Sequence, residues 1–343
     1  MPNLNVSQTL ACTIAAGLAL APALNGNAAD SDPIIAPGAE LTELFNDAHF
    51  TEGPTVAPDG TVYFSDITFT DQTDMQAGHI MRYNPETGET TVFRSPSGMS
   101  NGMEFDAQGR LVVAEGADFG GRRITRTDME TGKTEIIAGL YNGKPFNSPN
   151  DLAIDEQGRI YFTDPRYAGH EPVEQPIFGV YRIDPDGSIH LVVTDGGKPN
   201  GVAVSPDQKT LYVISHDNGA MGSNLPDDME PHKGQMALLA YDLSPEGTAT
   251  FRKVLVDYAP QDGPDGMVVD AEGNLWVAVR DETRPGVRVY TPDGEELAYV
   301  ETPDKPTNVA FGHGKTNKTL YITAEHCLYS IQTTKEGYRL PQK

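Results

Sequence analysis

The sequence predicts an all-β chain that folds as a six-bladed β-propeller with four-stranded blades. Three observations lead to this prediction. A strand-turn-strand pattern recurs six times, a second Gly-containing turn follows in every copy, and the composition is rich in Gly (35) and Pro (26). Such a composition favours many short strands joined by turns, and a repeat of this length is typical of propeller blades.

The repeated pattern consists of a polar residue, an apolar stretch, a turn and an alternating strand. Its copies are EGPTVAPDGTVYFSD, NGMEFDAQGRLVVAE, NDLAIDEQGRIYFTD, NGVAVSPDQKTLYVIS, DGMVVDAEGNLWVAV and NVAFGHGKTNKTLYITA. The first apolar residues of the second strands are Val62, Leu111, Ile160, Leu211, Leu275 and Leu320, at gaps of 49, 49, 51, 64 and 45 residues. The gap of 64 contains an insertion over residues 217–235, which we expect to be a surface loop.

The second turn is marked by Gly88, Gly132, Gly187, Gly247, Gly294 and Gly337, with alternating apolar residues on both sides. Each unit therefore holds about four strands. Residues 41–45 precede the first unit and are expected to add a strand to the last blade, which would close the ring and remove exposed edges. A solenoid is the alternative, and it would not require this closure.

The N-terminal segment is expected to direct export. Residues 1–29 contain a short apolar run that ends in small residues, as in a secretory signal peptide, and residues 30–40 follow as a linker. We therefore expect a periplasmic or secreted protein whose propeller domain spans residues 41–343. Removal of the signal leaves Cys327 as the single cysteine, which excludes an intramolecular disulfide and a thiolate metal site.

The formal net charge is −24, and the acidic residues are spread along the chain. Nucleic acid and anionic membranes are poor partners for such a surface, because both require a positive patch. The sequence leaves the oligomeric state open.

Polar residues begin all six units in nearly the same register. Glu52, Asn101, Asn150 and Asp265 lie 10 residues before their markers, Asn200 lies 11 before and Asn308 lies 12 before. In a propeller the first strand of each blade lines the central channel, so these side chains should converge at one mouth of it. Taken singly, each residue would be read as a turn former.

A divalent cation would explain this convergence, because buried oxygens need partners and neighbouring carboxylates repel. Carboxylate and amide oxygens suit calcium, which accepts an irregular all-protein shell, whereas Mg²⁺ usually keeps several waters. Mn²⁺ and Zn²⁺ are further alternatives, although the eight histidines show no paired zinc-ligand spacing. A competing GMSNG motif at residues 98–102 fits the nucleophile elbow of serine hydrolases, but a strand and not a helix is expected to follow it.

The blade starts EGP, SPND, KPNG and PDGM, with YFTDP after the third, resemble those of the senescence-marker-protein/gluconolactonase (regucalcin-like) family. The resemblance extends from about Leu41 to Tyr338 and implies a six-bladed, calcium-dependent lactone hydrolase. It implies metal binding by Glu52, Asn200 and Asp265, and a proton donor/acceptor role for Asp265. Asn150 matches a position that contacts metal or substrate, we place Asn101 near the substrate, and Asn308 is expected to be a structural turn.

One position departs from the family pattern. Some relatives carry an Arg two residues before the Asn of the third-blade motif, where this chain has Ser148. Arg166, Tyr167 and His216 are therefore candidates for substrate contacts in its place.

The expected function is hydrolysis of a sugar lactone, such as a gluconolactone-like aldonolactone, to the aldonic acid. Two alternatives remain open. One is a calcium-dependent phosphotriesterase or arylesterase on the same propeller, since the same ion can polarise a phosphoryl oxygen. The other is a non-catalytic propeller in which calcium is structural and one face binds a partner.

Overall fold

The computed structural model describes residues 33–76, 78–224 and 232–341. The chain from Pro33 onward forms one compact unit. The predicted signal peptide (1–29) and the start of the linker (30–32) lie outside the described residues, so export stays a prediction. None of the helices in the described ranges is long and apolar enough to cross a membrane.

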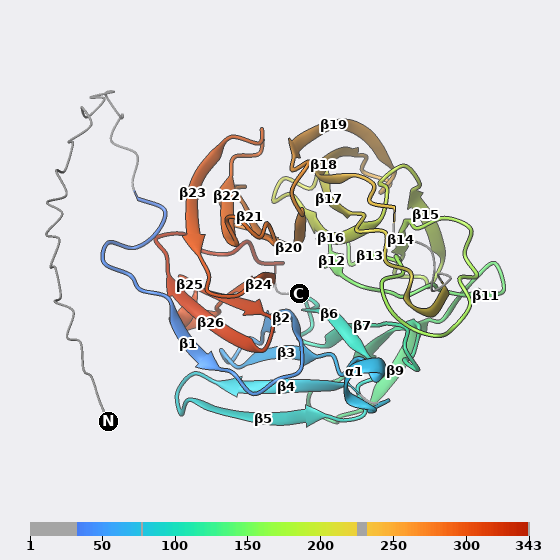
Figure 1. Cartoon of the computed structure of the whole chain (residues 1–343), viewed down its shortest axis with the longest axis horizontal. Coiled ribbons are helices and arrows are strands. Elements are labelled where there is room, and N and C mark those ends of the chain that lie inside the picture. The colour runs from blue at the N-terminus through green and yellow to red at the C-terminus, as the bar shows by residue number, and fades with distance from the viewer. Residues whose placement is uncertain (1–32, 77, 225–231, 342–343) are drawn as a thin grey trace, which may run out of the picture. The chain divides into compact units, whose positions relative to one another are not determined.

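Six antiparallel sheets of four strands are arranged in a ring, which confirms the predicted propeller (Figure 1). Blade 1 contains β2 (Thr51–Val56), β3 (Val62–Asp66), β4 (His79–Asn84) and β5 (Glu89–Arg94). Blade 2 contains β6 (Ser100–Phe105), β7 (Leu111–Glu115), β8 (Arg123–Thr127) and β9 (Thr134–Ala138). Blade 3 contains β12 (Leu152–Ile154), β13 (Ile160–Thr163), β14 (Val180–Ile183) and β15 (Ile189–Val193).

The second half of the ring has the same construction. Blade 4 contains β16 (Pro199–Val204), β17 (Thr210–His216), β18 (Met236–Leu243) and β19 (Ala249–Asp257). Blade 5 contains β20 (Pro264–Val269), β21 (Leu275–Val279), β22 (Gly286–Tyr290) and β23 (Glu296–Glu301). Blade 6 contains β24 (Pro306–Phe311), β25 (Thr319–Ala324), β26 (Cys327–Gln332) and β1 (Thr42–Phe45).

Short elements lie between the blades or between strands of one blade. A two-stranded hairpin, β10 (Leu140–Tyr141) and β11 (Lys144–Pro145), precedes blade 3. The helical turns are α1 (Thr70–Thr73), η1 (Gly222–Asn224) and η2 (Gly314–Thr316). The insertion lies between β17 and β18, as predicted, and its residues 225–231 are outside the described part.

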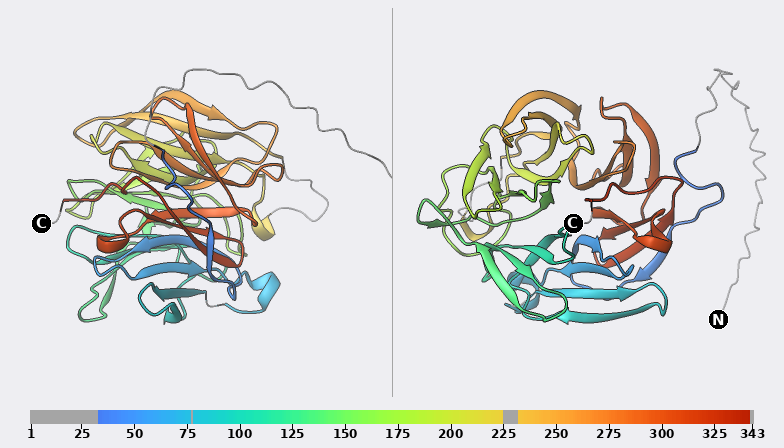
Figure 2. Two further views of the ribbon diagram at one scale, coloured as in Figure 1. Left: turned by 90° about the vertical axis from the view of Figure 1, so that its left-hand side faces the viewer. Right: turned by 180° about the vertical axis from the view of Figure 1, so that it is seen from behind.

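Closure of the ring confirms the propeller over the solenoid. Strand β1 pairs antiparallel with β26, with Thr42 opposite Ser330 and Glu43 opposite Tyr329. The innermost strand of blade 1, β2, also contacts the innermost strand of blade 6, β24. The two ends of the propeller sequence therefore share one sheet (Figures 1 and 2).

The hydrophobic core lies between neighbouring blades. Trp276 of β21 is fully buried and packs edge-on against Phe311 of β24, with ring centroids 5.2 Å apart. The inner three strands of the blades are mostly buried, whereas the outermost strands alternate between exposed and half-buried residues. This packing fixes the innermost strands around the central axis, where the sequence predicts the functional site.

Candidate active site at the mouth of the central channel

The six polar residues lie at the start of the innermost strands, as their register predicts. Glu52, Asn101, Asn200, Asp265 and Asn308 belong to β2, β6, β16, β20 and β24, and Asn150 comes just before β12. Pairing with the second strand is irregular at Glu52–Thr55, Ser100–Met103, Pro199–Val202 and Pro264–Met267. The polar-Gly pairs are therefore β-bulges inside strands and not turns, and a bulge re-aims the side chain that it carries.

The glycines of these bulges allow the innermost strands to meet at the axis. A Cβ at Gly53, which has a φ of +47°, would collide with the backbone of Asn101 and Gly102. A Cβ at Gly266 would collide with the side chain of Asn308. Only glycine fits at such approaches, so these residues bring the polar side chains of neighbouring blades together.

Five of the six polar residues line one cavity of about 220 Å³: Glu52, Asn101, Asn150, Asn200 and Asp265. Asn308 is the exception. It is buried within strand β24, so the prediction that it forms a structural turn is wrong. It donates from Nδ2 to Asp151 Oδ2 at 3.2 Å and lies 3.5 Å from Glu52 Oε2. Asn308 therefore connects the floor of the cavity to the channel beneath it.

Glu52 is a buried carboxyl group that forms no salt bridge with any residue the structure describes. It is 3% exposed, and its Oε2 accepts a hydrogen bond from the Gly53 amide at 2.8 Å. Burial raises the pKa of Glu52 well above 4.5, and repulsion from Asp265 and Asp151 raises it further. A cation at this place would relieve both effects.

Asp265 accepts a hydrogen bond at Oδ1 from Asn200 Nδ2 at 2.6 Å, and its Oδ2 lies 3.6 Å from Arg280 Nε. Burial raises the pKa of Asp265, and the Arg280 guanidinium opposes this shift. The same guanidinium binds Glu325 Oε1 at 2.8 Å, so its charge is shared between two carboxylates.

The donor set fits a hard divalent cation. Asn101 Oδ1 is buried and has no hydrogen-bond partner within the described part of the chain. An unpaired buried oxygen raises the free energy of the folded protein unless a ligand binds to it. Across the described ranges there is no group of three or more His, Cys, Asp or Glu side chains that could hold a metal. Two carboxylates and several amide oxygens make up this donor set, and oxygen donors of this kind are hard ligands.

Tyr167 and His216 line the same cavity, as expected for substrate contacts. The Tyr167 hydroxyl donates to the His216 backbone oxygen at 2.9 Å, and the two rings pack edge-on. His216 Nδ1 lies 2.9 Å from Pro264 O. Burial lowers the pKa of His216, although the negative charge of Asp265 opposes this shift, so the imidazole is neutral near pH 7.

Arg166 does not line the cavity. It is fully buried, and its guanidinium donates to Asn147 O at 2.7 Å and to Glu171 O at 2.9 Å. Its side chain therefore connects the loop that follows β13 to the loop that precedes β12. This geometry favours a structural role for Arg166 over the predicted contact with substrate.

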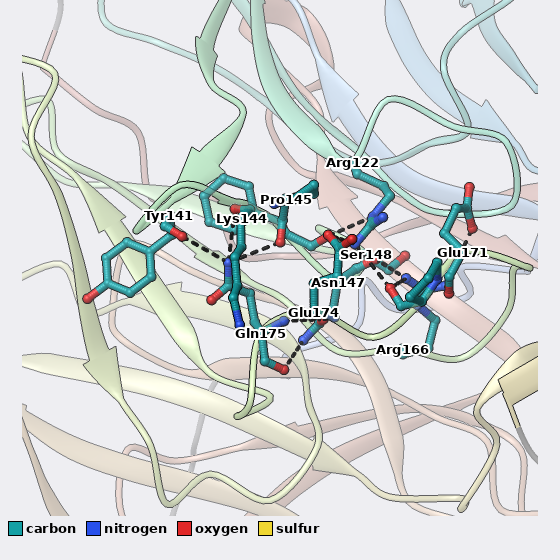
Figure 3. A network of polar contacts seen from close by, with 12 residues as sticks. Arg122, Tyr141, Lys144, Pro145, Asn147, Ser148, Arg166, Glu171, Glu174 and Gln175 are labelled. Atoms are coloured by element: carbon teal, nitrogen blue, oxygen red, sulfur yellow. Dashed lines mark hydrogen bonds and ion pairs between the residues drawn. The ribbon is translucent and has the colours of Figure 1, made fainter.

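The loop before β12 belongs to a polar network that holds this edge of the site (Figure 3). The backbone amides of Asn147 and Ser148 donate to the Asp164 carboxylate at 2.8 and 2.7 Å. The Asn147 side-chain oxygen accepts from the backbone amides of Glu174 and Gln175, both at 3.0 Å. Ser148 lines the cavity, so the network fixes a residue of the site.

Several apolar residues and two charged residues of the cavity lining were not predicted from the sequence. The apolar residues are Phe50, Ile67, Phe69, Met99, Ala117 and Ala168, and the charged ones are Asp118 and Arg280. Arg280 had a detectable signal. Residues four or five positions after the second-strand markers form another register: Asp66, Glu115, Asp164, His216, Arg280 and Glu325.

Comparisons with known proteins identify the relatives of this chain. Residues 50–326 match the family described as "SMP-30/Gluconolactonase/LRE-like region". The chain is 30% identical over 334 residues to a gluconolactonase of Zymomonas mobilis, a match that covers 89% of this chain and 85% of the relative. It is 28% identical over 285 residues to the pentonolactonase XacC of Haloferax volcanii, covering 79% and 80% of the two chains.

Solved structures show the same likeness. A gluconolactonase of Xanthomonas campestris superposes with a TM-score of 0.70 at 30% sequence identity. The superposition covers 89% of this chain and 96% of that chain. The similarity therefore spans all six blades.

Proposed function

Because this chain belongs to the SMP-30/gluconolactonase/LRE-like family and is a lactonase, we propose that it opens a sugar-derived lactone to the hydroxy acid with a divalent cation bound at the channel mouth. The observation that carries the proposal is the convergence of Glu52, Asp265 and Asn200 in one cavity. Relatives named gluconolactonase and pentonolactonase support an aldonolactone as the substrate.

Calcium is the ion we propose. Glu52 and Asp265 would together neutralise its charge, and Asn200 and Asn150 would add amide oxygens. When bound, such an ion polarises the lactone carbonyl and stabilises the negative charge that develops on its oxygen.

The residues of the chain itself bind and orient the lactone. The cavity lining combines polar side chains with apolar ones that include Phe50 and Phe69, so a ring entering it meets both hydroxyl-binding groups and carbon surface. Asn101 offers its unpartnered oxygen, and Tyr167 also lines the cavity. The family resemblance also implies that Asp265 exchanges a proton with the attacking water and the leaving alkoxide.

The direct test is a panel of aldonolactones assayed with the purified chain before and after EDTA treatment and dialysis. We expect hydrolysis that falls at least about 100-fold on chelation and returns with calcium. Isothermal titration calorimetry of the chelated protein should show one calcium site, which the Glu52→Gln variant loses. Full activity after chelation, with no calcium bound, would refute the metal mechanism.

A second candidate is a phosphotriesterase or arylesterase activity, which the apolar lining residues favour because they could accept an aryl group. A paraoxon-type ester assayed beside the aldonolactones separates the two. Faster turnover of the ester would assign the second function, and turnover of lactones alone would exclude it.

A further inference from the structure

We propose that His216 is the base that takes the proton from the attacking water, and that Asp265 acts as a metal ligand and not as the base. This inference rests on the proposed lactonase site and assigns its proton transfer to a different residue.

The hydrogen bond at Nδ1 fixes the tautomer of His216. Its partner is the carbonyl oxygen of Pro264, at 2.9 Å, and a carbonyl oxygen can only accept. Nδ1 must therefore carry the hydrogen, so the neutral imidazole has its lone pair on Nε2. Since Nε2 makes no hydrogen bond within the described ranges and His216 lines the cavity, this lone pair is available to a molecule bound there.

Further contacts position the main chain of His216 and pack against its ring. The His216 backbone amide donates to Lys198 O at 3.0 Å, and its backbone oxygen accepts from the Tyr167 hydroxyl. Lys198 Nζ lies 4.2 Å from the centroid of the Tyr167 ring and also binds Asn218 Oδ1 and Ala220 O. A buried lysine therefore supports the tyrosine that packs against the histidine, as expected for a preorganised catalytic group.

The carboxylates of the site are poorer bases. Asp265 already accepts from Asn200 Nδ2 at 2.6 Å and lies 3.6 Å from the positive Arg280. Glu52 is hydrogen-bonded by the Gly53 amide. Both would also be occupied by the proposed cation, and each of these contacts reduces the tendency of a carboxylate to accept a proton.

The step balances with one lactone and one water. Nε2 takes a proton from water while the water oxygen forms a bond to the lactone carbonyl carbon. The bond between the former carbonyl carbon and the ring oxygen then breaks, and the imidazolium returns the proton to the leaving alkoxide oxygen. The product is one hydroxy acid, and the neutral imidazole is restored.

The test uses the full chain with calcium and two variants, His216→Ala and His216→Gln. We expect kcat to fall at least about 100-fold in both, with KM within a few-fold. Added imidazole should restore part of kcat in the Ala variant, which leaves space for it, and not in the Gln variant. Calcium affinity measured by calorimetry should be unchanged in both.

His190→Ala is the matched control, because His190 is an exposed histidine of the outermost strand β15. Retention of kcat within a few-fold by the folded Gln variant would overturn the proposal. So would a large loss in the folded Ala variant that imidazole does not rescue, because this would assign His216 a structural role. If the wild-type chain opens none of the lactones, the proposed function fails first and independently.

Discussion

The two halves of the central channel are built from the same innermost strands, yet they differ in how their polar atoms are satisfied. The mouth opens into the cavity that holds Glu52, Asp265 and the orphaned oxygen of Asn101. The far half is a smaller space of about 120 Å³ that contains Glu104 and Asp151. Both halves therefore bury carboxyl groups, so acidity alone does not mark the functional site.

In the far half, the carboxyl groups also accept hydrogen bonds from local donors. Asp151 accepts from the Leu152 amide at 2.9 Å and from Asn308, and Glu104 accepts from the Ile154 amide at 2.9 Å. Burial raises the pKa of Asp151 to about 7 and that of Glu104 to about 8, so protonation also relieves them near neutral pH. Carboxyl groups accept hydrogen bonds in both halves, so it is the unpartnered Asn101 oxygen that marks the mouth as the half that can take up a ligand.

The largest expected effect is on kcat/KM, and it should differ between the two halves of the channel when the same Asp→Asn substitution is made in each. Asp265→Asn is expected to lower kcat/KM at least about 100-fold, because it removes a charge that holds the cation at the reacting centre. Asp151→Asn should cost at least tenfold less. Lactone kinetics and calcium calorimetry on both variants check this, and an Asp265→Asn variant with normal calcium binding and full activity would contradict it.

A pH-dependent stability difference should come from Glu104. Because its folded-state pKa of about 8 lies above the ordinary 4.5, stability is full below about pH 4.5 and is lost as the pH rises through about 8. Glu104→Gln keeps the acceptor for the Ile154 amide and cannot ionise. We expect it to be more stable than wild type at pH 8.5 by up to about 4–5 kcal/mol, and nearly equal at pH 4.5, in chemical denaturation.

Equal pH slopes for the two proteins would show that Glu104 does not ionise within the folded channel. Lactonase activity should be the same in both at pH 7, since the residue lies outside the candidate site.

Arg339, which lines the far half of the channel, should affect stability and not turnover. Arg339 donates from its guanidinium to Phe311 O, at 2.6 Å, and to Gly312 O. Arg339→Met removes both donors and should cost about 1–2 kcal/mol, or a few degrees in Tm by calorimetry. Arg252→Met, at an exposed position of β19, is the control. Reduced kcat at an unchanged Tm would contradict the structural role.

The smallest effect should come from the edge of the mouth. Ser148 Oγ accepts from the Ala117 amide at 2.9 Å, which positions part of the cavity wall. Ser148→Ala should raise KM about 2–5-fold with kcat unchanged, as expected for loss of one neutral hydrogen bond. Ser188→Ala, in the turn between β14 and β15 and outside the cavity lining, serves as reference, and an unchanged KM would show that the wall does not depend on this bond.

The register of the repeats made the fold and much of the site predictable. Counting back from the second-strand markers placed Glu52, Asn150 and Asp265 in one cavity, because equal spacing in every blade means equal height along the axis. Asn308 was misread as a turn, since a bulge inside a strand and a turn use the same residue types. Its contact with Asp151 joins residues of blades 6 and 3, and no local pattern encodes it.

The misplacement of Arg166 and the omission of Arg280 have different causes. Arg166 follows the YFTDP motif closely, but its direction is set by the carbonyls of Asn147 and Glu171 in the long loops of blade 3. Arg280 shares its place in the blade with His216, so the marker count could have found it. Apolar lining residues such as Phe50 and Phe69 cannot be separated from core residues by sequence alone.

The pairing of β1 with β26 sets the order in which the blades can complete their folding. Five blades are each complete within one continuous stretch of chain, so their hairpins can form as soon as that stretch is available. The sixth must wait until the last residues meet the first strand, a contact of very long sequence separation that favours slow folding. Until then, blades 1 and 6 do not pack against each other. The site is incomplete at that stage, because its residues come from both sides of this junction.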